Sequence, residues 1–209
     1  MDSTLFLVPT EIELESLSSS FVGRIQNAKS KLAVCGFGPI ASAIRTIQLI
    51  TRYSPKQVLL FGVAGTLNAS CEVGTAVEFD ETICFGIGAG SGENFLSASE
   101  MGWKHWLRDP EITDSILLRD DGLTAEVPLL TCCSASGNER EVQWRLKKYP
   151  NAVAEDMEGF SVAAACRFAG TPLRIIRGIS NKAGDRDKAN WRVREAMAAV
   201  EQSIREVFD

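Results

Sequence analysis

The chain has 209 residues, with 27 acidic and 22 basic side chains, a formal net charge of −5 and a single histidine, His105. One histidine excludes a multi-histidine metal centre, so acid–base chemistry is expected to rest on carboxylates. The acidic excess and the absence of a Lys/Arg-rich run argue against nucleic acid as a partner. We therefore expect an ordinary globular protein that is large enough to bury a hydrophobic core.

Short apolar runs recur along the chain, and each is followed by a turn and then by a helical pattern. This alternation is typical of an α/β protein whose sheet is largely buried. The runs that predict strands are residues 5–8, 32–35, 58–61, 129–132 and 173–176.

Two stretches show the spacing of amphipathic helices. Residues 40–53 place isoleucines three and four positions apart, and Pro39 suits the first turn of such a helix. Residues 193–207 predict a second helix that packs on the core. Residues 86–122 are irregular and predict a long loop, either a wall of a substrate site or a plain connection. No linker divides the chain, so residues 1–209 are expected to form one domain.

The six cysteines form no C-x-x-C pair, and most lie in apolar runs, as free buried thiols do. This usage indicates a reducing compartment. The first residues carry neither a signal-peptide pattern nor a membrane-spanning run. A cytoplasmic protein without membrane association is therefore expected.

Glycines follow three of the predicted strands, at residues 36–38, 62–65 and 178. Ligands of open α/β sheets collect at the carboxyl ends of the strands, where glycines allow close backbone approach. Val63, Ala64 and Gly65 are therefore candidate substrate contacts. Tight turns alone would also explain any single cluster, and neither a P-loop nor a complete G-x-G-x-x-G is present.

Two groups of acids also lie near predicted strand ends. Glu11, Glu13 and Glu15 follow the first strand, and residues 155, 156 and 158 precede the apolar helical run 160–169. Carboxylates at helix starts are explained by the helix dipole alone. Alternatively, two carboxylates that lie together at one end of the sheet could activate water and hold a sugar.

Several segments, in a consistent order, resemble the nucleoside phosphorylase and nucleosidase superfamily. Residues 178–191 (GISNKAGDRDKANW), and Val8-Pro9-Thr10 with Glu13, look most like the futalosine hydrolases of that superfamily. The other segments are LAVCGFGPIASA (32–43), VLLFGVAGTL (58–67), VGTAVEFDE (73–81), AEDMEGFSVAA (154–164) and IIRGISN (175–181).

The resemblance implies one α/β domain around a mixed, partly barrel-like sheet flanked by helices, in a homo-oligomer (dimer or higher). It implies an enzyme that needs neither cofactor nor metal and acts on a small-molecule nucleoside. For futalosine hydrolases the reaction is hydrolysis of the N-glycosidic bond of futalosine, which releases hypoxanthine and dehypoxanthinyl futalosine in menaquinone biosynthesis.

The same resemblance implies roles for two acids and a methionine. Glu158 would accept hydrogen bonds from the ribose hydroxyls while Met157 packs on the sugar. Glu13 would orient and deprotonate the attacking water. Because N-glycosidic cleavage develops an oxocarbenium-like sugar, a carboxylate beside the ring stabilises positive charge.

The base is expected to lie near Asn181, where adenine-releasing relatives carry Asp. An amide cannot act as a general acid, but it offers a donor and an acceptor, which suits a 6-oxopurine. Ser180 would orient this amide or serve as a turn residue. Ser136 lies in the segment that holds the base in relatives, with Phe85, Phe160 or a loop tryptophan as the stacking ring.

Two further positions bear on the reaction and on the substrate. Bacterial hexameric phosphorylases place a phosphate-binding arginine where this chain has Leu60, which favours water over phosphate, unless Arg45 or Arg177 supplies the charge from elsewhere. Arg186 would bind a substrate carboxylate, or would belong to a solvated charge run. The open alternatives are an adenine-releasing methylthioadenosine/adenosylhomocysteine nucleosidase, a phosphorylase, and a non-catalytic nucleoside-binding protein. His105 is expected to be a loop or surface residue.

Overall fold

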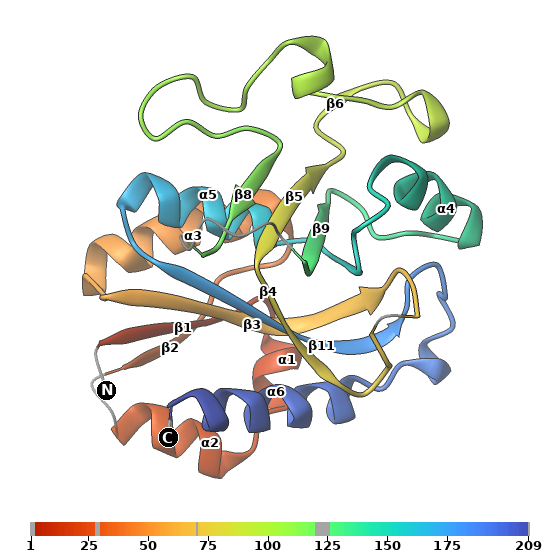
Figure 1. Cartoon of the computed structure of the whole chain (residues 1–209). Coiled ribbons are helices and arrows are strands. Elements are labelled where there is room, and N and C mark those ends of the chain that lie inside the picture. The colour runs from red at the N-terminus through yellow and green to blue at the C-terminus, as the bar shows by residue number, and fades with distance from the viewer. Residues whose placement is uncertain (1–2, 28–29, 70, 120–125, 209) are drawn as a thin grey trace.

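The computed structural model describes residues 3–27, 30–69, 71–119 and 126–208 (Figure 1). At its centre is a mixed sheet of nine strands. The strands are β1 (Thr4–Val8), β2 (Lys31–Val34), β3 (Gln57–Thr66), β4 (Ala76–Phe79), β5 (Glu81–Phe85), β8 (Ser115–Leu117), β9 (Pro128–Cys132), β10 (Ala154–Asp156) and β11 (Leu173–Lys182).

Part of this sheet closes on itself. Strand β3 pairs with β11, β11 with β4, β5 with β9, β9 with β10, and β10 again with β3. Only Asp80 separates β4 from β5, and its buried carboxylate accepts hydrogen bonds from the amides of Glu126 (2.9 Å) and Val127 (3.0 Å). The predicted α/β fold with a mixed, partly barrel-like sheet is therefore confirmed.

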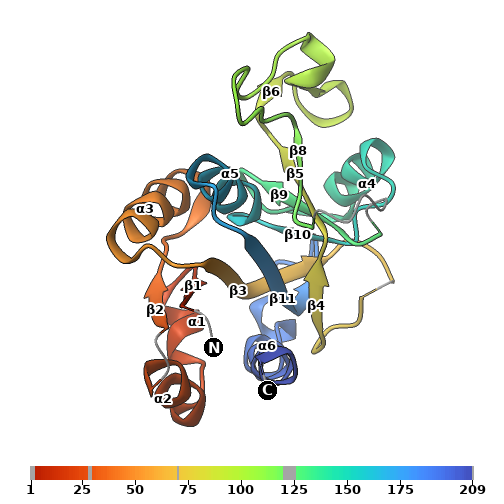
Figure 2. The same cartoon turned by 60° about the vertical axis from the view of Figure 1, so that its left-hand side comes forward.

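The helices lie on several sides of the sheet (Figures 1 and 2). Strand β3 directs Leu60 toward the core cluster of α3 and α5, and Leu59 and Phe61 toward that of α2 and α6, as the period of two in a strand requires. The helices are α1 (Glu11–Glu15), α2 (Ser19–Asn27), α3 (Gly38–Tyr53), α4 (Glu139–Lys148), α5 (Gly159–Ala169) and α6 (Val193–Phe208).

The five predicted strands and the helices at 40–53 and 193–207 are present, although β3 and β11 extend beyond their apolar runs. Residues 154–156 form an additional strand, β10, which the sequence did not predict, so Glu155 and Asp156 lie in the sheet shortly before α5. A three-residue strand with two acids has no recognisable apolar pattern.

The segment after β5 projects from one end of the molecule (Figure 1). It contains the short strands β6 (Gly88–Ala89) and β7 (Leu96–Ser97) and two 3₁₀ turns, 92–94 and 99–101, before β8. Residues 120–122 of the predicted loop lie outside the described residues.

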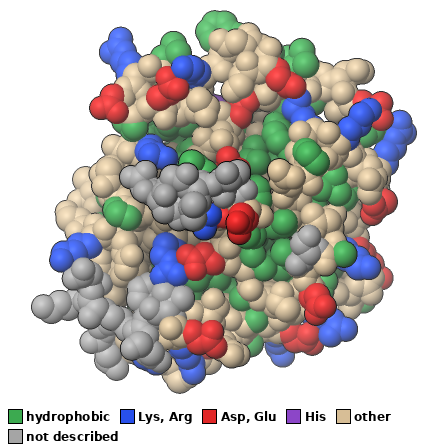
Figure 3. All heavy atoms as spheres, in the orientation of Figure 1, with side chains coloured by type: hydrophobic (Ala, Val, Ile, Leu, Met, Phe, Trp, Pro, Cys, Tyr) green, Lys and Arg blue, Asp and Glu red, His purple; other side chains and the backbone are tan. Residues whose placement is uncertain are grey.

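All six cysteines are free, and all but Cys133 are buried, as expected. None of the described helices is long and apolar enough to cross a membrane. On the face shown in Figure 3, acidic and basic side chains are interspersed and form no basic stripe.

Candidate active site

Helix α1 places Glu13 directly after strand β1. Thr10 is the N-cap residue, and its hydroxyl accepts a hydrogen bond from the Glu13 amide (3.3 Å) and donates to Glu13 Oε2 (2.6 Å). The other carboxylate oxygen, Oε1, accepts from the amide of Val63 on β3 (2.9 Å). Glu13 is only 6% exposed, so two donors hold a nearly buried carboxylate in one orientation.

Glu158 lies at the start of α5, but its carboxylate does not cap that helix. Asp156 does so instead, because its Oδ2 accepts a hydrogen bond from the Gly159 amide (2.9 Å). Glu158 Oε1 accepts from the amide of Gly38 (2.8 Å), in the glycine cluster that follows β2. The second acidic group and this glycine cluster thus meet, although they are distant in sequence.

Arg177 on β11 connects these carboxylates. Its side chain is completely buried, and Nη2 lies 2.5 Å from Asp156 Oδ2 and 3.4 Å from Glu158 Oε2. Burial alone would lower the pKa of this guanidinium, but the surrounding carboxylates raise it, so Arg177 stays charged. Among the described residues, Nη1 has no hydrogen-bond partner.

Gly62 brings the arginine and the first acid together. A Cβ at this position would lie 2.5 Å from both Arg177 Nη1 and Glu13 Oε1. Both atoms therefore approach the same side of the Gly62 backbone, which no other residue type would allow.

The Glu158 carboxyl has an unusual pKa. Burial raises it from 4.5 to about 7, and the negative charges of Asp156 and Glu13 act in the same direction. Arg177 and the Gly38 amide oppose this rise. Glu158 can thus exchange a proton near neutral pH. The carboxylate cluster, which consists of Glu13, Asp156 and Glu158 around Arg177, keeps an excess of negative charge.

Asn181 and Ser180 lie near the end of β11, and both are buried. The hydroxyl of Ser180 donates to Asn181 Oδ1 (2.8 Å), and Asn181 Nδ2 donates to the carbonyl oxygen of Lys182 (2.8 Å). These bonds fix the orientation of the amide and leave one Nδ2 hydrogen for another acceptor. Gly65 is the neighbour of Asn181 on β3, and a Cβ there would lie 3.5 Å from Asn181 Nδ2.

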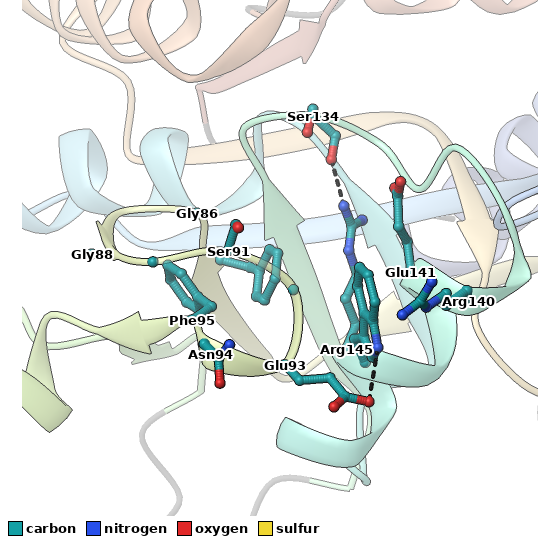
Figure 4. A pocket seen from close by; sticks show the side chains of 14 residues that line it. Gly86, Gly88, Ser91, Glu93, Asn94, Phe95, Ser134, Arg140, Glu141 and Arg145 are labelled. Carbon is teal, nitrogen blue, oxygen red and sulfur yellow. Dashed lines mark hydrogen bonds between the residues drawn. The ribbon is translucent and has the colours of Figure 1, made fainter.

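Ser136 belongs to the loop 133–138 between β9 and α4. Its amide donates to Glu155 Oε1 (2.8 Å) and its hydroxyl to Glu155 Oε2 (2.7 Å), so both donors are already used. Glu155 also forms a buried ion pair with Arg145 of α4, which donates in addition to the Ser134 carbonyl oxygen (2.8 Å; Figure 4). This neutral network anchors the loop.

The other residues predicted to contact the substrate are Met157, Val63, Ala64 and Arg186. Met157 is half-buried, and Val63 and Ala64 follow Gly62 on β3. Arg186 is exposed, and its guanidinium lies 5.2 Å from the centroid of the Trp191 ring. Phe85 packs against Phe95 and beneath Arg145.

An apolar groove of about 880 Å³ runs between α3, α5 and the segment after β5. His105 lines it, half-buried, with its ring 5.3 Å from that of Phe160 and a 3.2 Å contact to Asp114. The exposed apolar side chains along the groove are Ile40, Ile44, Ile47, Ile87, Trp106 and Phe168.

The sequence did not reveal the central position of Arg177 or the part played by Asp156. A signal was present, because Arg177 interrupts the alternation of Ile175 and Ile179 on an inward-facing strand. No group of three or more His, Cys, Asp or Glu side chains placed to hold a metal occurs in the described part of the chain.

Residues 16–209 match the phosphorylase superfamily, and the chain belongs to this family. More specifically, it is similar to futalosine hydrolases. It is 30% identical to that of Thermus thermophilus over 179 residues, 83% of this chain and 78% of the relative. It is 29% identical to that of Streptomyces coelicolor over 147 residues, 70% of this chain but only 63% of the relative.

Among solved structures, the fold matches 5′-methylthioadenosine/S-adenosylhomocysteine nucleosidase from Neisseria meningitidis in complex with methylthio-immucillin-A. The TM-score is 0.77 at 19% identity, over 100% of this chain and 99% of the other. The predicted resemblance is thus confirmed, as is an enzyme of the nucleosidase class.

Proposed function

We propose that the protein hydrolyses the N-glycosidic bond of futalosine and releases hypoxanthine and dehypoxanthinyl futalosine, a step of menaquinone biosynthesis. The observation that carries this proposal is the pairing of a buried carboxylate cluster with an oriented amide, Asn181, near the strand ends. The similarity to two futalosine hydrolases supports the choice of substrate.

At the sugar, Glu158 accepts hydrogen bonds from the 2′- and 3′-hydroxyls, and Met157 packs against the ring. Water lies beside the Glu13 carboxylate, which Thr10 and the Val63 amide hold in one orientation. Glu13 takes the proton as the oxygen bonds to C1′. The negative cluster stabilises the oxocarbenium character of the sugar in the transition state.

At the base, Asn181 Nδ2 donates to N7 or O6 of the purine as the C1′–N9 bond breaks. An amide cannot transfer a proton, so the departing base leaves as an anion stabilised by this hydrogen bond and takes its proton from solvent. A 6-oxopurine spreads this negative charge over O6 as well as the ring nitrogens. Adenine has no oxygen at C6 and cannot spread the charge in this way.

Water, and not phosphate, is the proposed nucleophile. Leu60 is completely buried within β3 and offers no charge to a phosphate group. Arg177 is already paired with two carboxylates, and Arg45 is exposed on α3. Binding a phosphate dianion beside this negative cluster would carry a large electrostatic cost.

The homo-oligomer and the cytoplasmic location expected from the sequence remain part of this proposal. The exposed side chains along the apolar groove, such as Ile40 (77% exposed), are the surface that a second copy would cover. Light scattering of the purified protein tests this point, and a monomer at micromolar concentration would contradict it.

The activity is tested by incubating the purified protein with futalosine, inosine and methylthioadenosine and separating the free bases by chromatography. Hypoxanthine from futalosine is the expected product. Adenine from methylthioadenosine without hypoxanthine from futalosine would overturn the proposal in favour of the adenine-releasing nucleosidases.

A further inference from the structure

We propose that Ser42 and Ser161 are positioning residues for the sugar-binding carboxylate, because the buried hydrogen bond between them holds the first turn of α3 against Glu158. The mechanism above gives neither hydroxyl a role, although both side chains are buried. This inference rests on the proposed function, since it concerns the carboxylate that binds the ribose there.

Glu158 accepts a hydrogen bond from the amino end of α3. The N-cap residue of this helix, Phe37, makes no side-chain hydrogen bond to the first turn. The Glu158 carboxylate supplies an acceptor instead, because its Oε1 bonds the Gly38 amide (2.8 Å). The amino end of a helix carries partial positive charge, so this contact stabilises the ionised carboxylate and fixes its orientation.

Two serine hydroxyls join α3 and α5, which lie side by side (Figures 1 and 2). Ser42 lies one turn after Gly38 on α3, and Ser161 lies three residues after Glu158 on α5. The two Oγ atoms are 2.7 Å apart, and the side chains are only 0% and 8% exposed. At this distance one hydroxyl must donate to the other, and the accepting hydroxyl can still donate elsewhere.

The further contacts of these hydroxyls lead back to the residues that meet at the carboxylate. Ser42 Oγ lies 2.8 Å from the Gly38 carbonyl oxygen, and Ser161 Oγ lies 2.8 Å from that of Glu158. With the bond from the Gly38 amide to Glu158 Oε1, these contacts close a ring that connects the two helices. A shift of α3 relative to α5 would therefore lengthen the carboxylate contact and the serine contact together.

A hydroxyl pair fixes the distance between two helices more tightly than apolar packing does. The bond requires oxygens about 2.5–3.0 Å apart, whereas apolar side chains tolerate small displacements. Thr46 provides the comparison, because it lies one turn beyond Ser42 on α3 and is equally buried. Its hydroxyl has no hydrogen-bond partner among the described residues, so burial on this helix does not by itself require a polar partner.

The pKa of Glu158 reports the strength of the Gly38 contact. Burial and the neighbouring acids raise this pKa from 4.5 to about 7, whereas the arginine and the Gly38 amide oppose the rise. The Cys35 thiol, which also interacts with this carboxyl, stays protonated because burial raises its pKa to about 12. The charged groups that face the carboxyl are Arg177 on β11, Asp156 on β10 and Glu13 on α1. Serine variants leave all of these groups in place, so a further rise in pKa would report a weakened Gly38 contact.

Carboxyl ¹³C NMR titration of the purified protein measures this pKa without substrate, and the Glu158 signal is the one missing in Glu158→Gln. We expect Ser42→Ala and Ser161→Ala each to raise the pKa of Glu158 by at least about half a pH unit. Because both remove the same bond, the double variant is expected to show no more than the larger single shift.

Two control variants are expected to keep the wild-type pKa. Thr46→Val deletes a buried α3 hydroxyl that has no partner among the described residues, and Ser161→Thr keeps the bonding hydroxyl. Unchanged pKa values in both alanine variants, or additive shifts in the double variant, would overturn the inference. The same holds if either control shifts as much as the alanine variants.

Kinetics connect this positioning to the reaction. In each alanine variant, kcat/KM for futalosine is expected to fall about 3- to 10-fold, and its acid limb is expected to move to higher pH. On the Glu158→Gln background, Ser161→Ala is expected to change kcat/KM at most about twofold, because the carboxylate that it positions is gone. The full loss on that background would overturn the positioning role. Failure of the wild type to hydrolyse futalosine would instead contradict the proposed function, and the NMR titration would still test the contact.

Discussion

The two ends of the site both contain a buried arginine paired with glutamate, but their charge balance differs. At the sugar end, Arg177 faces Asp156, Glu158 and Glu13, and its Nη1 has no partner in the described part of the chain. At the base end, Arg145 is matched by Glu155 alone, and its guanidinium is bonded on several sides.

This difference corresponds to the chemistry proposed at each end. Excess negative charge and a Glu158 pKa of about 7 suit a place where positive charge develops and a proton moves. A neutral, hydrogen-bonded network suits the recognition of an uncharged base in one orientation. The following variants break this comparison, in order of decreasing expected effect.

Glu13→Gln removes the carboxylate that accepts the proton from water. The side-chain oxygen of the new glutamine can still accept a hydrogen bond from the Val63 amide or from the Thr10 hydroxyl. We predict a fall in kcat of about 10²- to 10⁴-fold for hypoxanthine release from futalosine. Glu15→Gln, at an exposed position of the same helix, is the control and should keep full activity. A Glu13→Gln enzyme within fivefold of wild type would contradict the assigned role.

Arg177→Met leaves Asp156 and Glu158 buried without their cation. We predict a loss of about 3–5 kcal/mol in the free energy of unfolding, measured with urea at pH 8. Arg145→Met is expected to cost less, because it leaves one carboxylate that Ser136 still bonds twice. An equal or larger loss in Arg145→Met would mean that the two ends do not differ as described.

Glu158→Gln tests the raised pKa. In the wild type, kcat/KM should rise with pH up to about 7 and then level, because the ionised carboxylate accepts from both ribose hydroxyls. The variant should lose about 10- to 100-fold in kcat/KM and also this acid limb. An acid limb that persists in Glu158→Gln would assign the titration to another group.

The same pKa predicts the sign of a stability change. Between pH 4.5 and about 7 the folded protein holds this proton more tightly than the unfolded chain does, so the contribution of Glu158 to stability decreases as pH rises. Urea unfolding of the wild type and Glu158→Gln across this range should show a smaller decrease in the variant.

Thr10→Val has the smallest expected effect. It removes the hydroxyl that caps α1 and donates to Glu13 Oε2, at a cost of about 1 kcal/mol, or roughly fivefold in kcat. Thr10→Ser keeps the hydroxyl and should retain activity. A Thr10→Val enzyme that retains wild-type kcat would show that this bond does not orient the carboxylate.

Much of the architecture could be predicted because it depends on local patterns of apolar residues in the sequence. Apolar runs mark the interior strands, and the isoleucine spacing with Pro39 marks α3. Strand β10 could not be predicted in this way, since its acids are stabilised by Arg145 and Arg177, which come from other elements. The sequence likewise indicated the carboxylates near strand ends, but not that Asp156 caps α5 and leaves Glu158 to face Gly38.

The central claim is that the protein breaks the N-glycosidic bond of a 6-oxopurine nucleoside with water. The most direct test measures hypoxanthine release from futalosine in phosphate-free buffer and again with added phosphate, together with a search for a sugar phosphate. We predict equal rates in the two buffers and no sugar phosphate. Release that depends on phosphate, or no release of hypoxanthine in either buffer, would contradict it.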